Sequence, residues 1–306
     1  MIILYGGGGF LGSHVRMRLA ARSDEKVVLV ARCEPALPLT EREVFISAAN
    51  FGEEAGLAPL REAHSIIYLA ATSTVATFVD RPWSELDENV APLMRLAKRL
   101  VRENAQCRLI FTSSGGTIYG RAHGVGPIAE DQPCRPISAY GLGKLMAEQA
   151  LQFFARTEGL DFRILRVSNP VGRFARSTTQ GLVSVAMNAI ISGRPITLFG
   201  DGSNVRDLVD ADDVADALIM SCFDTDWHGA TWNIGSGAGI SNREVLELVG
   251  RITGKPVPLE LAPARPQDVP AIVLDCRKAS RELGWHPSRA LDQTVAELWA
   301  SRAGIV

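Results

Sequence analysis

Short apolar runs alternate along the chain with segments whose hydrophobic positions recur at helical spacing. Six runs predict strands, at Ile2 to Tyr5, Val27 to Val30, Val44 to Ser47, Ser65 to Leu69, Leu109 to Thr112 and Phe162 to Val167. Parallel strands need crossover helices between them, and this alternation supplies the helices. The pattern therefore predicts an α/β fold with a doubly wound parallel sheet and helices on both faces.

Two of the intervening helices carry start signals. Ser84 is a candidate cap for a helix with a stripe of Leu86, Val90, Leu93, Ala97 and Leu100, and Pro92 is expected to bend that helix or mark its beginning. Ser138 is a candidate cap for a second helix. Its buried stripe is predicted to hold Leu142, Leu145, Met146 and Phe153.

The alternation of strand and helix patterns ends after Val167. Asn169-Pro170 is followed by a loop, a helical run and the turn Phe199 to Gly202. We therefore predict a dinucleotide-binding domain over residues 1–168 and a smaller C-terminal α/β substrate lobe over residues 169–306. Residues 205–234 are expected to return to the first domain, since Thr231 to Ile234 predicts a late strand.

A glycine-rich turn joins the first strand to the first helix. Gly6, Gly9 and Gly12 have the spacing Gly-x-x-Gly-x-x-Gly, and the helix is predicted from Ser13 to Arg22. Bare backbone there permits a tight turn and close approach of a pyrophosphate to the positive end of the helix. The strand, loop and helix together predict dinucleotide binding, with Phe10 and Leu11 as further cofactor contacts.

The end of the second strand bears on the choice of dinucleotide. Enzymes that bind NAD usually carry a carboxylate there, which accepts hydrogen bonds from the adenine ribose. Here the strand ends in Ala31-Arg32, and the Arg32 guanidinium could pair with a 2′-phosphate. This favours NADP over NAD. In the alternative, Arg32 is solvated and Glu34 or Asn50 bonds the ribose.

Composition excludes several other classes of function. A formal charge of -2 over 306 residues gives no reason to expect nucleic-acid or anionic-membrane binding. The five cysteines and five histidines are scattered, so no metal site is expected. The apolar stretch around Leu182 to Ile191 is too short to span a bilayer, and no signal peptide is recognisable. We therefore expect a cytoplasmic protein.

Tyr140 and Lys144 form the candidate catalytic pair. They lie one turn apart on the same face of the predicted helix. A tyrosine hydroxyl has an ordinary pKa of about 10, so it needs nearby positive charge to act as a base near neutrality. A lysine ammonium and an oxidised nicotinamide would both supply that charge.

Other motifs follow in order: Leu69-Ala70-Ala71, Asn89-Val90, Phe111-Thr112-Ser113-Ser114, Tyr119-Gly120, Asn169-Pro170, Arg206-Asp207, Asn233-Ile234-Gly235 and Arg265-Pro266-Gln267-Asp268. With the glycine loop and the Tyr140/Lys144 pair, they make the chain resemble the extended short-chain dehydrogenases/reductases of the nucleotide-sugar epimerase/dehydratase type. The resemblance covers essentially the full length and implies a Rossmann fold.

This resemblance also implies roles for particular residues. Tyr140 would be the acid or base at a sugar hydroxyl, and Lys144 would bind the nicotinamide ribose. Leu69, Ala70, Ala71 and Asn89 would contact the cofactor, and Asn169, Arg206 and Arg265 would hold the nucleotide diphosphate of the substrate. The family further implies a homodimer, formed through the helices at Ser84 to Val101 and Ser138 to Ala155.

One position departs from the family pattern. Four residues before Tyr119, where relatives place a Ser or Thr that bonds the reacting hydroxyl, this chain has Gly115. Ser114 and Thr117 are the nearest replacements, and Ser113 points the other way if the strand continues. The segment also lacks the Thr-Asp-Glu typical of the family's 4,6-dehydratases, which argues against dehydration.

Three functions remain open from the sequence. The first is an NAD(P)-dependent C4 epimerase of a nucleoside-diphosphate sugar, working through a transient 4-keto sugar. The second is an NADPH-dependent nucleotide 4-ketosugar reductase, which Arg32 favours. The third is a cofactor-binding sensor or scaffold that has lost catalysis, suggested by Gly115 and opposed by the intact Tyr140 and Lys144.

Overall fold

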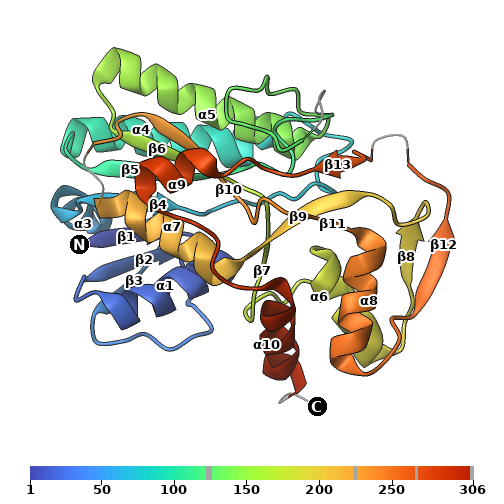
Figure 1. Cartoon of the computed structure of the whole chain (residues 1–306). Helices are drawn as coiled ribbons and strands as arrows, with labels where there is room; N and C mark the ends of the chain where they lie inside the picture. The colour runs from blue at the N-terminus through green and yellow to red at the C-terminus, as the bar shows by residue number, and fades with distance from the viewer. Residues whose placement is uncertain (122–125, 224–225, 266–267, 304–306) are drawn as a thin grey trace.

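Seven parallel strands form the main sheet of the protein (Figure 1). The computed structural model describes residues 1–121, 126–223, 226–265 and 268–303. The sheet order is β10-β6-β5-β4-β1-β2-β3. The strands are β1 Ile2–Tyr5, β2 Val27–Ala31, β3 Glu43–Ser47, β4 Ser65–Tyr68, β5 Arg108–Ser114, β6 Phe162–Val167 and β10 Ala230–Ile234. This confirms the predicted doubly wound α/β fold and all six expected strands.

Alternate residues of β1 enter two separate cores. Ile2 and Leu4 pack in one core with residues of α1 Phe10–Arg22 and α7 Ala211–Phe223. Ile3 packs in the other with residues of α3 Leu57–Glu62, α4 Ala91–Glu103 and α5 Ala139–Glu158. Because side chains alternate across a strand, a central strand covered on both faces must be apolar throughout. In Figure 1, α4 and α5 lie on one side of the sheet and α1 and α7 on the other.

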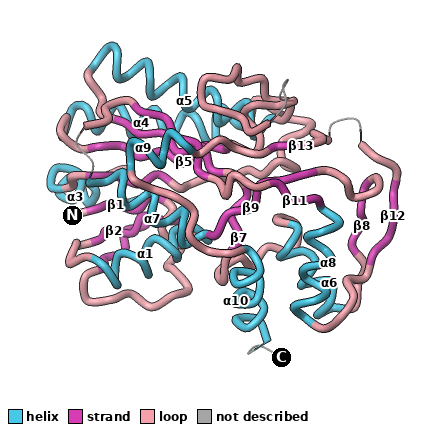
Figure 2. Tube along the Cα trace, in the orientation of Figure 1, coloured by secondary structure: helices cyan, strands magenta, loops and turns pink. Residues whose placement is uncertain are grey.

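Shorter elements build the second lobe, at the right of Figure 2. A sheet ordered β11-β9-β13 also carries β7 on β9, and β8 pairs with β12 in a second, two-stranded sheet. The elements of this lobe are β7 Asn169–Val171, α6 Leu182–Ser192, β8 Ile196–Phe199, β9 Val205–Asp210, β11 Gly239–Ser241, α8 Asn242–Thr253, β12 Leu259–Ala262, β13 Ala271–Ile272 and α10 Leu291–Ala303. Between β13 and α10, the helix α9 Arg277–Leu283 packs against β10 of the main sheet. In the first domain, α2 Ala48–Phe51 and a 3₁₀ turn Glu54–Gly56 precede α3.

The chain crosses between the two regions more than once. After β9, α7 packs against α1, where Arg18 Nε donates to Asp216 at 2.7 Å, and β10 then pairs in parallel with β6. Asp207 on β9 is fully buried and accepts hydrogen bonds from Ser236 N at 2.7 Å and Leu274 N at 3.1 Å. This carboxylate therefore joins β9 to the loops after β10 and β13.

Two predicted helix stripes differ from the structure. In α5, Leu142 and Phe153 are 44% and 48% exposed, while Gly141, Gly143 and Ala147 face the interior. Small residues let this helix approach its neighbours closely, which turns the large side chains outward. In the other helix, Leu86 is 42% exposed because Leu86–Val90 forms a π-helical turn, whose wider spacing shifts it from the buried stripe.

Of the three predicted helix start signals, two are confirmed and one is wrong. Ser138 caps α5 as predicted, accepting a hydrogen bond from Gly141 N, and Pro92 lies at the beginning of α4. Ser84, by contrast, is buried, and the π-helical turn that follows it has no side-chain cap.

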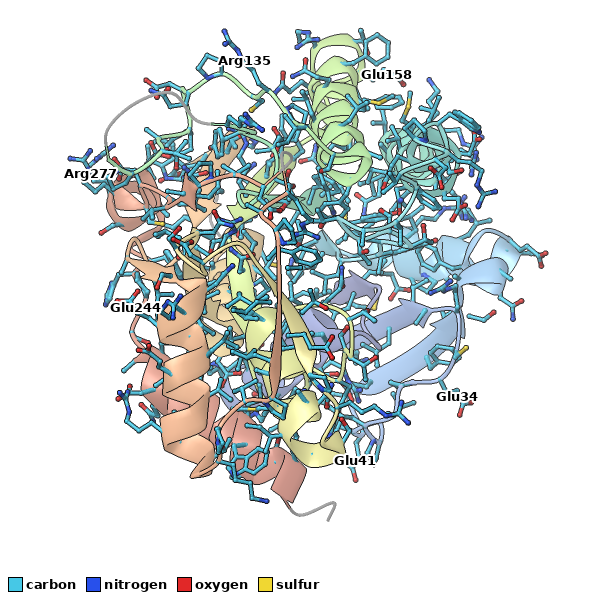
Figure 3. The ribbon with its side chains drawn as sticks, turned by 90° about the vertical axis from the view of Figure 1, so that its right-hand side faces the viewer. Glu34, Glu41, Arg135, Glu158, Glu244 and Arg277 are labelled. Atoms are coloured by element: carbon cyan, nitrogen blue, oxygen red, sulfur yellow. The ribbon has the colours of Figure 1, made fainter. Side chains whose placement is uncertain are left out.

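Charged side chains lie mainly on the outside. Figure 3 shows Glu34 and Arg277 at the edge of the molecule. None of the helices in the described residues is long and apolar enough to cross a membrane.

Candidate functional site

The glycine loop lies at the carboxyl end of β1. Gly6 has φ +91°, and a Cβ there would lie 2.7 Å from Ala70 N. A Cβ at Gly12 would lie 2.5 Å from Gly7 O, so neither position accepts a side chain without a shift of backbone. Gly9 is exposed and is the N-cap of α1, and the partly exposed Phe10 and Leu11 form the first turn of that helix. The loop leaves bare backbone at a helix N-terminus, which suits a pyrophosphate.

The loop after β2 faces this glycine loop. A Cβ at Gly8 would lie 3.6 Å from both Ala31 Cβ and Pro35 Cα. Arg32 is exposed between them, as is Glu34 (Figure 3), while Asn50 is an exposed residue of α2 whose backbone N–H donates to the Ser47 hydroxyl at 3.2 Å. Arg32 is therefore closer in the fold to the glycine loop than its place in the sequence indicates.

Asn89 holds the segment that follows β4. Its side-chain oxygen accepts a hydrogen bond from Thr72 N at 2.9 Å, and its side-chain nitrogen donates to the Ser73 hydroxyl at 3.0 Å. These bonds fix Leu69, Ala70 and Ala71, the residues predicted to contact the cofactor. Ala70 also packs against Gly6. Asn89 thus orders the loop beside the glycine turn.

Tyr140 and Lys144 lie in the first two turns of α5, next to the end of β5. Lys144 Nζ donates to the Thr112 carbonyl at 2.7 Å and lies 4.8 Å from the centre of the Phe111 ring. Burial lowers the pKa of Lys144 to about 8, although the carboxylates of Glu85 and Glu148 oppose that change. Burial raises the pKa of Tyr140 to about 12, and Glu85 adds to this increase.

Ser114 is the hydroxyl that the structure brings to Tyr140. The Ser114 side chain interacts with that of Tyr140 and lowers the pKa of the tyrosine against the effect of burial. Gly115 points elsewhere, because a Cβ there would lie 2.5 Å from Leu274 Cδ1 and 2.8 Å from Arg166 O. Thr112, Ser113 and Thr117 each have a buried hydroxyl with no hydrogen-bond partner among the described residues.

The three residues expected to hold the substrate diphosphate come from β7, β9 and the loop before β13. Asn169 Nδ2 donates to Asp207 O at 2.9 Å, and its side chain lies near Gly116. Arg206 donates to the carbonyls of Val205 and Val269, at 2.7 and 2.8 Å. Burial lowers the pKa of Arg206, and the nearby charge of Arg265 adds to this decrease. Arg206 and Arg265 are thus near enough for their charges to interact.

Arg265 has partners of its own. Its guanidinium lies 4.1 Å from the centre of the Phe199 ring and pairs with Asp268 at 2.8 Å. Pro266 and Gln267 of the same motif lie outside the described residues. A planar cation stacked on an aromatic ring presents its free edge in one direction, which favours recognition of a phosphate.

Sequence reasoning missed two groups beside the catalytic pair. One is the Thr112 carbonyl, which binds Lys144 and cannot be recognised from a side-chain pattern. The other is Glu85, which is 2% exposed and acts electrostatically on both Tyr140 and Lys144. The signal for Glu85 was Gly143, an otherwise unexplained glycine inside a helix.

Comparison with known proteins agrees with this geometry. A model of the NAD dependent epimerase/dehydratase family matches residues 2–235. The UDP-glucose 4-epimerase of Streptococcus mutans is 31% identical over 329 residues, covering 98% of this chain and 96% of the relative.

Two solved structures resemble the whole chain. A UDP-glucose 4-epimerase from Thermotoga maritima, crystallised with UDP-glucose, has a TM-score of 0.89 and 29% identity and covers 99% of both chains. The UDP-glucose 4-epimerase of Thermus thermophilus in complex with NAD has a TM-score of 0.87 and 27% identity, covering 100% of this chain and 99% of the other. The chain therefore belongs to the NAD-dependent epimerase/dehydratase family, as an enzyme of the extended short-chain dehydrogenase/reductase type.

Proposed function

We propose that this enzyme is an NAD(P)-dependent C4 epimerase of a nucleoside-diphosphate sugar, working through a transient 4-keto sugar. The observation that carries the proposal is the contact between Tyr140 and Ser114, one helical turn from Lys144 and beside the glycine loop. The three UDP-glucose 4-epimerases that match along the whole chain support a uridine diphosphate sugar as the substrate.

The glycine loop fits the cofactor that this reaction needs. Gly6 and Gly12 leave no room for a Cβ, and Gly9 exposes backbone at the N-terminus of α1. We assign the pyrophosphate to this loop and the nicotinamide ribose to Tyr140 and Lys144. When bound, the nicotinamide supplies a reversible hydride acceptor.

Tyr140 moves the proton in the proposed reaction. As the sugar C4 loses its hydride, the Tyr140 oxygen accepts the proton of the C4 hydroxyl, and the hydroxyl becomes a carbonyl. The keto sugar then rotates in the site and presents its other face. Tyr140 returns the proton to the oxygen, and C4 regains the hydride on that face. Ser114 would hold the reacting oxygen by a second hydrogen bond throughout.

Lys144 makes this proton transfer easier. Its ammonium stays on the Tyr140 side of the helix because the Thr112 carbonyl holds it at 2.7 Å. A positive charge held there would stabilise the tyrosinate that accepts the substrate proton. With Lys144 beside it, Tyr140 could act as the general base in the first half of the reaction and as the general acid in the second.

Asn169, Arg206 and Arg265 are the proposed diphosphate ligands. Arg206 and Arg265 interact electrostatically and therefore lie on one side of the lobe. Binding a diphosphate would relieve the repulsion between them, which raises affinity for a doubly charged ligand over a neutral sugar.

One observation favours a second candidate, an NADPH-dependent 4-ketosugar reductase. Arg32 is exposed beside the glycine loop, and its guanidinium has no hydrogen bond or ion pair within the described part of the chain. A 2′-phosphate of NADP would give it a partner. Such an enzyme would consume its cofactor, with Tyr140 donating the proton.

One experiment separates these candidates. The protein is incubated with UDP-, dTDP- and GDP-sugars and with their 4-keto forms, in the presence of NAD or NADPH. Sugar stereochemistry is followed by NMR and the reduced cofactor by absorbance. Inversion at C4 without net cofactor turnover supports the epimerase, whereas stoichiometric loss of NADPH would replace it with the reductase. Tyr140→Phe should abolish either activity, and full activity of that variant would exclude both mechanisms.

We also propose a homodimer formed through α4 and α5. These helices contact each other, and the apolar side chains that they and the preceding loop expose are Val79, Trp83, Leu86, Leu142 and Phe153. Val79 and Trp83 are 72% and 63% exposed in a single chain. Exposed large apolar side chains mark a protein contact when they form one contiguous patch, which is what the proposed interface requires of these residues.

A further inference from the structure

Glu85 is a buried acid to which the mechanism above gives no role. It lies just before the π-helical turn Leu86–Val90 and is 2% exposed. Its Oε2 accepts a hydrogen bond from Asn89 Nδ2 at 2.8 Å. Its Oε1 is buried and has no hydrogen-bond partner among the described residues. A buried carboxylate with an unpaired oxygen destabilises a fold, so its presence calls for a compensating function.

The chain makes space for this carboxylate at Gly143. That glycine lies inside α5, between Tyr140 and Lys144, where every residue except proline would favour the helix more. A Cβ at Gly143 would lie 2.7 Å from Glu85 Oε2 and 3.0 Å from Glu85 Cβ. The absence of a side chain at Gly143 is therefore what lets the carboxylate lie against the catalytic turn of α5.

Glu85 and Lys144 line one small cavity. Its other walls include Tyr68 and Ala70, and its volume is about 10 Å³. This is about the space of a single water, and Asn89, a proposed cofactor contact, also lines it. Glu85 therefore lies beside Lys144, at the turn of α5 proposed to hold the nicotinamide ribose.

The charges around the cavity leave Glu85 as the main uncompensated acid near Lys144. Among the acids that raise the pKa of Lys144 against burial, Glu85 comes before Glu148. Glu148 forms an ion pair with Arg166, with a distance of 2.7 Å between Oε2 and Nη2. From the other elements, Tyr68 of β4 lines the cavity, and Arg95 of α4 interacts with Tyr68.

We propose, on the basis of the function proposed above for Tyr140, that Glu85 is a positioning residue: its carboxylate, seated against Gly143 and held by Asn89, keeps Lys144 cationic beside the catalytic tyrosine. Burial alone would favour a neutral lysine, which could not stabilise a tyrosinate. The negative charge of Glu85 also opposes ionisation of Tyr140, so one carboxylate raises the pKa of both groups.

This double effect gives a signature that a purely structural residue would not produce. Without the Glu85 charge, Tyr140 and Lys144 both lose their protons at lower pH. Both limbs of the profile of kcat/KM against pH therefore move to lower pH, whichever group sets each limb. We expect each limb to move by about 1 pH unit, the usual effect of one nearby charge.

The test compares Glu85→Gln with the parent protein and with Glu88→Gln, a matched control at an exposed acid of the same turn. Gln keeps the size of the side chain and an acceptor for Asn89. Two quantities are measured: the pH profile of kcat/KM, and the pKa of Lys144 in the cofactor-free protein by pH-dependent competitive acetylation with peptide mass spectrometry. Glu85→Gln should lower both limbs and the pKa of Lys144, and Glu88→Gln should change neither.

Gly143→Ser provides a second variant with the carboxylate retained. The added side chain must displace Glu85, so the pKa of Lys144 should fall here too, in a protein whose circular dichroism matches the parent. If Glu85→Gln reduces kcat while both limbs and the pKa of Lys144 stay in place, Glu85 is structural and the proposal is wrong. The acetylation measurement needs no substrate, so it decides this question even if the parent epimerises no sugar tested.

Discussion

At the scale of single residues, the site depends on which hydroxyl meets Tyr140. The sequence left Ser114 and Thr117 open, and the structure brings Ser114 to the tyrosine. Gly115 cannot share the task, since its Cβ position is occupied by Leu274 and by backbone of β6. The buried Thr117 hydroxyl has no partner in the described structure and stays a candidate for contact with the substrate.

The first prediction concerns this serine. Ser114→Ala should lower kcat by about 10²-fold, because a hydrogen bond to the reacting oxygen is lost in the transition state. KM should change little. Ser113→Ala is the matched control, since Ser113 is the neighbouring residue of the same strand and alternates to the other face. Steady-state kinetics on both variants would measure the effect, and equal losses in the two would count against Ser114.

A second residue-scale prediction concerns cofactor choice. Arg32→Ala should weaken NADPH binding by about 10- to 100-fold, because a charge-assisted contact to the 2′-phosphate is lost. NADH binding should be unchanged, since NADH lacks that phosphate. Fluorescence titration with both reduced cofactors measures this directly. Equal effects on the two, or none on NADPH, would show that Arg32 is only solvated.

At the scale of elements, the cofactor site is made by strand ends. The residues after β1, β2, β4 and β5 meet along one edge because parallel strands present their carboxyl ends together. The glycine loop fits against the segment after β4, where Gly6 touches Ala70. Asn89 then ties that segment to the helix before α4. Each element thus positions the next around the site.

The loop offers a matched pair of glycine substitutions. Gly6→Ala should weaken cofactor binding at least about 10-fold, because φ is +91° and the new Cβ would lie 2.7 Å from Ala70 N. Gly8→Ala in the same loop meets only ordinary contacts, at 3.6 Å and beyond, so it should remain within about 2-fold of the parent. Calorimetric titration with NAD and NADPH would measure both. Similar losses in the two variants would mean that the loop tolerates no substitution, independent of backbone conformation.

At the scale of the whole molecule, the sheet carries the cofactor residues and the second lobe carries the proposed substrate ligands. Asp207 joins the two by accepting hydrogen bonds from backbone of two loops. Its neighbour Arg206 lies on the same strand and donates to the Val269 carbonyl of the loop before β13, at 2.8 Å.

The proposed dimer makes a prediction at this scale. Trp83→Asp should convert the dimer to a monomer, because a charge would be buried in an apolar contact. Leu261→Asp, at a residue of β12 that is 77% exposed, is the control and should leave the assembly unchanged. Sedimentation velocity reports the mass of each. A parent protein that sediments as a monomer at micromolar concentration would refute the proposed interface.

The local sequence pattern was sufficient to predict many elements of this fold. The strands, the glycine turn, the Ser138 cap and the spacing of Tyr140 and Lys144 follow from hydrophobic period, backbone freedom and helix geometry, all of which act over a few residues. Those same signals predicted the α/β class correctly. The helical pattern predicted the wrong buried face for α5. Gly143, which packs against Glu85, faces the interior, and Leu142 and Phe153 are exposed.

What local pattern could not supply were the contacts between residues far apart in the chain. Ser114 meets Tyr140, Lys144 meets the Thr112 carbonyl, and Glu85 lies against Gly143 only because β5, α5 and the turn before α4 converge. Burial then sets the pKa values of Tyr140 and Lys144, and burial is a property of the packed molecule. The candidate site residues could thus be named from the sequence, whereas their protonation states and contacts depend on tertiary packing, because burial and long-range neighbours determine both.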